Sequence, residues 1–93
     1  MQLTDRQRER IAEISRKHGA TSVRVFGSRA RGQATETSDL DLLVELDKGR
    51  SLLDLIDLQS SLEEELGISV DVLTPNSLSP YLRESVEKEA VAL

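Results

Sequence analysis

One segment of the chain alternates acidic and apolar side chains, and it limits the folds open to this sequence more than any other feature. From Asp39 to Asp47 the residues read Asp-Leu-Asp-Leu-Leu-Val-Glu-Leu-Asp. A β-strand turns successive side chains to opposite faces, so this period of two predicts a strand with one apolar and one acidic face. The sequence Lys48-Gly49-Arg50 then ends the strand as a turn. The fold must therefore cover one face of this strand and leave the other partly open.

Asp39 and Asp41 lie two positions apart, so both carboxylates project from the same face of the predicted strand. Two like charges this close repel each other, and protonation, a neighbouring Arg or Lys, or a divalent cation relieves the repulsion. The chain has no cysteine, so any metal here would take oxygen ligands, which is the ligand set of magnesium. An isolated Asp-x-Asp pair on a surface strand can equally face water and discourage edge pairing.

The rest of the chain predicts helices and strands in a mixed order. Thr4 with Gln7, and Ser51 with Asp54, are capping boxes, and Ser79-Pro80 is an N-cap and N1 pair. The expected elements are a helix over residues 4–18, a strand over 22–26, a helical turn over 28–31, a loop over 33–38, the acidic strand over 39–47, a leucine-rich helix from Ser51 to Gly67, a strand over 68–73, and a last helix carrying Leu82, Val86, Ala90 and Leu93.

This order predicts the fold class. Ninety-three residues suffice for a single domain, residues 1–93, with one core. Two strands that follow each other closely, then a helix crossover to a third strand, indicate an α/β fold with a small mixed β-sheet and helices packed on its apolar face. The acids would lie on the other face.

A third carboxylate extends the acidic pair into a candidate site. In the strand over 68–73, Asp71 alternates with Val70 and Val72, so it can join the face that carries the other two acids. Three acids near one point favour a two-metal site for a triphosphate and an attacking oxygen. Asp39 and Asp41 would hold the metals, and Asp71 would complete the site and help to deprotonate the nucleophile.

The step Gly27-Ser28 offers a phosphate site beside these acids. It leaves a strand for a helical turn, where free backbone N–H groups and the Ser28 hydroxyl suit phosphate oxygens. Arg29 and Arg31 add positive charge for a polyphosphate tail. Taken alone, Gly-Ser also describes an ordinary turn in which Ser28 is only an N-cap.

Together these motifs resemble the signature of the minimal nucleotidyltransferases, small relatives of the polymerase-beta-like nucleotidyltransferases. The signature is Gly27-Ser28, ten residues and Asp39-Leu40-Asp41, with Ala30-Arg31-Gly32 and with Ser38 before the first acid. The resemblance covers nearly the whole chain, and it implies a nucleotidyltransferase fold that uses ATP or another nucleoside triphosphate with two Mg²⁺ ions. It assigns nucleotide binding to Gly27, Ser28, Arg29, Arg31 and Ser38, and metal binding and catalysis to Asp39, Asp41 and Asp71.

The resemblance also implies a partner. Members of this family are commonly encoded beside a HEPN-domain protein, as a toxin–antitoxin pair. This chain would be the antitoxin, which neutralises the HEPN ribonuclease toxin by transferring AMP from ATP to one of its tyrosines. A non-catalytic antitoxin that neutralises the HEPN partner by complex formation is the alternative. A phosphohydrolase fits less well, because there the first acid ends its strand as a nucleophile, whereas here the pair opens the strand.

Composition and charge exclude other classes. The net charge of −5 and the presence of only two aromatic residues, Phe26 and Tyr81, argue against direct nucleic-acid binding. No apolar run has membrane-spanning length and the start lacks a leader pattern, which predicts a cytoplasmic protein without membrane contact. Leu53 and Ile56 lie beside the leucine stripe and suit a partner surface, which favours a hetero-oligomer and leaves a homo-oligomer open.

Overall fold

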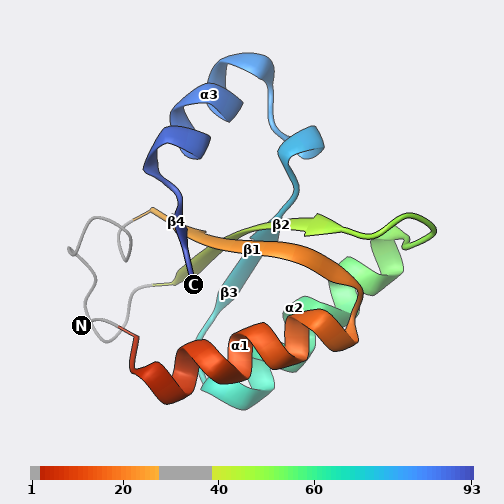
Figure 1. Ribbon diagram of the computed structural model, residues 1–93, viewed down its shortest axis with the longest axis vertical. Helices are drawn as coiled ribbons and strands as arrows, with labels where there is room; N and C mark the ends of the chain where they lie inside the picture. The colour runs from red at the N-terminus through yellow and green to blue at the C-terminus, as the bar shows by residue number, and fades with distance from the viewer. Residues whose placement is uncertain (1–2, 28–38) are drawn as a thin grey trace.

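The computed structural model describes residues 3–27 and 39–93, and its centre is a four-stranded mixed sheet (Figure 1). The strands are β1 Ala20–Phe26, β2 Leu40–Leu46, β3 Val70–Leu73 and β4 Val91–Ala92, in the spatial order β3-β2-β1-β4. The helices are α1 Asp5–Lys17, α2 Leu52–Leu66 and α3 Pro80–Glu89, with the 3-10 helix η1 at Pro75–Ser77. β1 is antiparallel to β2 and β4, and β2 and β3, which α2 connects, are parallel. The predicted mixed sheet is therefore confirmed.

The predicted helix starts are confirmed by their capping contacts. At the start of α1, the Gln7 N–H donates to Thr4 Oγ1 over 3.1 Å, and the Thr4 N–H donates to Gln7 Oε1 over 2.8 Å. At the start of α2, the Ser51 N–H donates to Asp54 Oδ2 over 2.8 Å. Each box satisfies N–H groups that a helix start leaves without partners. The predicted stop of α2 is also confirmed, because Gly67 adopts a left-handed φ of +70°.

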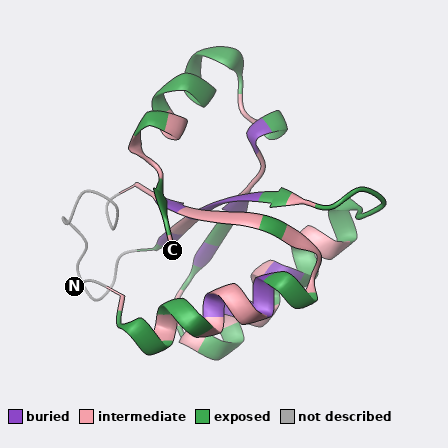
Figure 2. Cartoon of the chain, in the orientation of Figure 1, coloured by how far each residue is buried: buried purple, intermediate pink, exposed green. Residues whose placement is uncertain are grey.

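Helices α1 and α2 cover one face of the sheet, and the core lies between them and the strands (Figures 1 and 2). Each strand contributes every second side chain to this core, because alternate residues of a strand share a face. The buried apolar residues of this core are Ile11, Ile14, Val25, Leu40, Leu42, Val44, Leu58, Leu62, Val70 and Val72. Within the described residues, no helix is long and apolar enough to cross a membrane.

The end of the chain departs from the expected last helix. α3 ends at Glu89, Ala90 adopts an extended backbone at φ −66° and ψ 135°, and β4 then pairs with β1. Ala90 and Leu93 are therefore not part of a helical stripe. None of the residues of α3 is buried, so no packing extends the helix, whereas pairing of Val91 with Val25 satisfies backbone groups of the sheet edge.

Other predicted boundaries differ by a few residues. β1 begins at Ala20 rather than at residue 22, because Gly19, with φ +86°, turns the chain directly from α1 into the strand. β3 begins at Val70 rather than at Ile68. The expected helical turn over 28–31 and the loop over 33–38 lie outside the described residues.

Candidate active site

Two of the three predicted acids lie side by side in the sheet. Asp41 of β2 pairs with Asp71 of β3 in parallel register, and with Phe26 of β1 in antiparallel register. Directly paired residues project from the same face, so Phe26, Asp41 and Asp71 form a row across three strands. Adjacent strands lie about 4.8 Å apart, which brings the two carboxylates within reach of one ligand.

This row lies on the face away from the main core. The next row along the strands, Val25, Leu42 and Val72, is buried beneath α1 and α2, so the acids project to the opposite side. Asp41 is partly buried and Asp71 is exposed. The Leu40 N–H donates to the Ser69 carbonyl over 2.9 Å, which fixes the register of β2 and β3 beside the acids.

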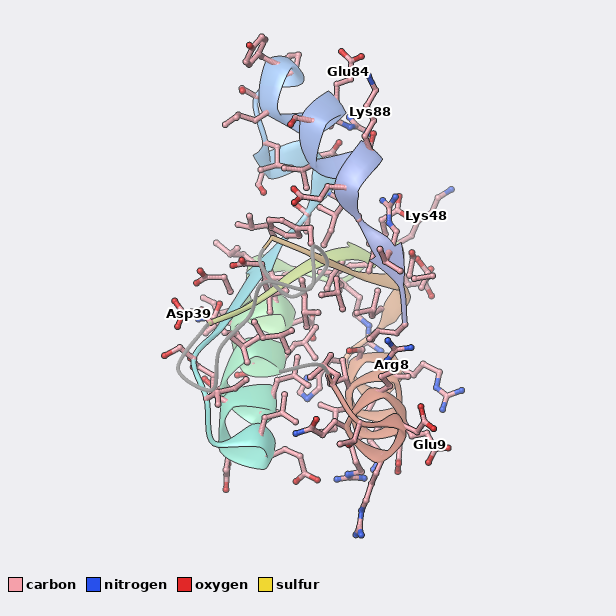
Figure 3. The ribbon with its side chains drawn as sticks, turned by 90° about the vertical axis from the view of Figure 1, so that its left-hand side faces the viewer. Arg8, Glu9, Asp39, Lys48, Glu84 and Lys88 are labelled. Carbon is pink, nitrogen blue, oxygen red and sulfur yellow. The ribbon has the colours of Figure 1, made fainter. Side chains whose placement is uncertain are left out.

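Asp39 lies just before β2, at the margin of the molecule (Figure 3). Its side chain is exposed, and it stands two positions from Asp41. The expectation that both acids belong to the open side of the sheet agrees with this placement, since Leu40 between them is fully buried in the core.

The backbone of Gly27 lies directly against Asp41. Gly27 follows the last residue of β1 and has a left-handed φ of +77°. A Cβ built on Gly27 would overlap Asp41 Oδ2 and would lie 3.2 Å from Asp41 Cγ. The strand end that carries the predicted Gly-Ser step therefore borders the acid pair, as a combined phosphate and metal site requires. Ser28, Arg29, Arg31 and Ser38, the other predicted nucleotide-binding residues, lie outside the described residues.

The carboxylates suit a magnesium ion that is bound together with a nucleotide. Across residues 3–27 and 39–93, no three or more His, Cys, Asp and Glu side chains gather at metal-binding spacing, so a three-carboxylate centre stays a prediction. Mg²⁺ usually takes only one or two carboxylates and completes its shell with water and substrate phosphates. Asp41 and Asp71, paired on neighbouring strands, meet that requirement with hard oxygen donors.

The sequence interpretation missed Arg24, which lies on the same face of the sheet as the acids. Arg24 lies two positions before Phe26 in β1, so the two side chains share a face, and Arg24 pairs with Leu43 of β2. Its Nε is buried and has no hydrogen-bond partner among the described residues, while Nη2 lies 3.8 Å from Glu87 Oε1 of α3. The parity was visible in the sequence, but the α3 contact was not. Arg24 links α3 to the face that carries the site.

Comparison with known proteins identifies the family. The sequence model of the nucleotidyltransferase domain family matches residues 6–93, almost the whole chain. A Methanocaldococcus jannaschii protein, provisionally named a protein adenylyltransferase, is 50% identical over 84 residues, which are 90% of this chain and 90% of that protein. The protein adenylyltransferase MntA of Thermococcus cleftensis is 39% identical over 79 residues, covering 85% of this chain and 80% of MntA.

Solved structures agree with this match. A structure described provisionally as a minimal nucleotidyltransferase is 50% identical, with a TM-score of 0.86 over 95% of this chain and 90% of that one. A toxin–antitoxin complex with AMP-PNP has a TM-score of 0.79 over 91% of this chain and 70% of its own, and at 22% identity it supports the fold alone. The sequence match, the mixed sheet and the paired acids beside Gly27 together place this chain in the nucleotidyltransferase domain family, as one of its minimal members.

Proposed function

We propose that this protein is a magnesium-dependent protein adenylyltransferase that transfers AMP from ATP to a tyrosine of a HEPN-domain ribonuclease toxin, and so acts as its antitoxin. The observation that carries the proposal is the pairing of Asp41 with Asp71 beside Gly27, on the open face of a nucleotidyltransferase sheet. The transfer of AMP to a protein is inferred from two relatives that are named protein adenylyltransferases, one of them provisionally.

The partner class is supported by complexes of the same fold. One solved structure is a tri-AMPylated HEPN toxin of Shewanella oneidensis in complex with its MNT antitoxin, with a TM-score of 0.74 at 18% identity. This chain also exposes apolar side chains at the start of α2, where Leu53 is 71% and Ile56 is 53% exposed. Exposed apolar groups of this kind suit a protein partner, and they agree with a hetero-oligomer. A cytoplasmic location belongs to the same proposal.

The proposed reaction is a displacement at the α-phosphorus of ATP. The phenolic oxygen of the acceptor tyrosine forms a bond to that phosphorus, the bond to the bridging oxygen of the β-phosphate breaks, and pyrophosphate leaves. Mg²⁺ bound with the nucleotide supplies neutralisation of the triphosphate charge. Asp39, Asp41 and Asp71 would hold the metal and orient the nucleotide, and Asp71, which is exposed and lies opposite Asp41 in the sheet, would accept the phenolic proton. The family resemblance assigns the triphosphate contacts to Gly27, Ser28, Arg29, Arg31 and Ser38, and the proposal keeps this assignment.

Neutralisation by complex formation alone is the second candidate, and the exposed apolar residues of α2 favour it, because binding needs no chemistry. The two candidates separate when Asp41→Asn and Asp71→Asn are compared with the wild type in two assays on the co-expressed HEPN protein. Transfer of label from α-³²P ATP and inhibition of the ribonuclease should be lost together. A variant that transfers no label but still inhibits the ribonuclease would establish the binding antitoxin instead.

A further inference from the structure

Gly27 is the described glycine whose missing side chain leaves space for a site carboxylate. A Cβ at this position would overlap Asp41 Oδ2 and come within 3.2 Å of Cγ and 3.5 Å of Cβ of the same residue. The comparable case is Gly19, where the neighbour is the long side chain of Arg50, which can move aside. At Gly27 the neighbour is the short side chain of Asp41, whose Cα is held between β1 and β3 by pairing on both sides, so the carboxylate can give way only by rotating.

A methyl group at residue 27 would therefore change the side-chain rotamer of Asp41. The short Asp side chain can relieve the overlap by moving to another staggered position about χ1 or by turning about χ2, and either rotation re-orients the carboxylate oxygens. In a site that holds a hard cation, small displacements of a ligand weaken binding, because Mg²⁺ demands near-ideal octahedral geometry.

We propose that Gly27 is a positioning residue for Asp41, and that the absence of a side chain at residue 27 sets the carboxylate orientation used to hold the metal–nucleotide pair. This role differs from a contact of Gly27 or Ser28 with the triphosphate. The effect on metal and nucleotide binding rests on the proposed function. The steric coupling of residues 27 and 41 does not depend on it.

The chain offers matched controls for the backbone cost of removing this glycine. Gly49 has a φ of +85° and Gly67 a φ of +70°, close to the +77° of Gly27, and no atom lies within 4 Å of a Cβ built at either position. Alanine at Gly49 or Gly67 therefore imposes the left-handed strain without a steric neighbour. Any excess effect of Gly27→Ala over these two variants measures the contact with Asp41.

The first test is a double-mutant cycle on thermal unfolding without nucleotide. Gly27→Ala should lower Tm more than Gly49→Ala or Gly67→Ala does in the wild-type background. With Asp41→Ala present, the carboxylate is gone, and the further loss of Tm caused by Gly27→Ala should shrink to that of Gly49→Ala. An equal loss in both backgrounds would overturn the proposal.

The second test measures the metal requirement of nucleotide binding. The rise of Tm caused by AMP-PNP is titrated with Mg²⁺ for the wild type, Gly27→Ala and Gly49→Ala. Mutation of the surroundings that orient a metal ligand typically weakens metal affinity about 10- to 100-fold, so the Mg²⁺ midpoint of Gly27→Ala should rise by that factor while that of Gly49→Ala stays unchanged.

Two results would count against the proposal. An unchanged Mg²⁺ midpoint with a weaker response to AMP-PNP would mean that Gly27 only contacts the nucleotide. A wild type that AMP-PNP and Mg²⁺ do not stabilise would refute the proposed function and the metal role with it, while the unfolding cycle would still decide whether residues 27 and 41 are coupled.

Discussion

At the scale of single residues, one ion pair joins the two helices of the core face. Arg10 Nε of α1 donates to Glu65 Oε1 of α2 over 2.6 Å, and Arg10 Nη1 lies 3.0 Å from Glu13 Oε2. The hydrogen bond from Arg10, followed by its positive charge, lowers the pKa of the Glu65 carboxyl below its ordinary value of 4.5. The same bond raises the pKa of Arg10.

This contact predicts a pH-dependent contribution to stability. Because the pKa of Glu65 is lower in the folded protein, its ion pair stabilises the fold fully above pH 4.5 and loses its effect as the pH falls through the lowered value. Glu65→Gln should therefore lower Tm at pH 7, and its difference in Tm from the wild type should shrink steadily as the pH is lowered below 4.5. The neighbouring, exposed Glu64→Gln is the control and should show no such difference. Equal effects of the two substitutions at pH 7 would contradict the assignment.

The sequence predicted the acids of the site, but not what lies against them. Alternation alone placed Asp41 and Asp71 on the non-core faces of their strands, and the parallel register then put them opposite each other. The contact of Gly27 with Asp41 depends on the register between β1 and β2, which local pattern does not determine. The contact of Arg24 with Glu87 of α3 joins residues far apart in the sequence, so local pattern did not reveal it either.

At the scale of elements, α3 differs from the other helices in its attachment. It has ten residues, none of them buried, and it lies on the far side of the sheet from α1 and α2 (Figures 1 and 2). An isolated helix shorter than about 12 residues is marginal in water, so α3 depends on its Ser79 cap, its Arg24–Glu87 contact and the flanking β4. Apolar periodicity predicted this helix, but it could not reveal that Leu82 stays exposed and that Val86 is only partly buried.

The weak attachment predicts local opening of α3 without global unfolding. Amide hydrogen exchange should show protection in α2, around Leu58 and Leu62, at the level of global stability, whereas amides of α3 should exchange at least tenfold faster. Both helices have side-chain caps at their starts, so the comparison isolates packing. Equal protection of α3 and α2 would show that α3 is held by contacts beyond those described, and its stated dependence on the sheet edge would be wrong.

At the scale of the whole molecule, α1 and α2 cover one face of the sheet, and the opposite face carries Asp41, Asp71 and the contact of Arg24 with α3. The order of helices and strands, the mixed sheet and the family were accessible from the sequence, because capping boxes, glycine stops and the spacing of Gly27 and Asp41 are local signals. The fourth strand was not, since a two-residue pairing at Val91–Ala92 leaves no periodicity to detect. The proposed acceptor, a tyrosine of another protein, could not be read from this chain.

The most direct test of the account is mass spectrometry, intact and after peptide digestion, of the proposed HEPN-domain partner after incubation with this protein, ATP and Mg²⁺. The account predicts a gain equal to one or more AMP groups on a tyrosine of the HEPN protein, abolished by Asp41→Asn and by chelation of Mg²⁺. An unmodified HEPN protein whose ribonuclease is nevertheless inhibited would contradict the transfer of AMP as the basis of neutralisation.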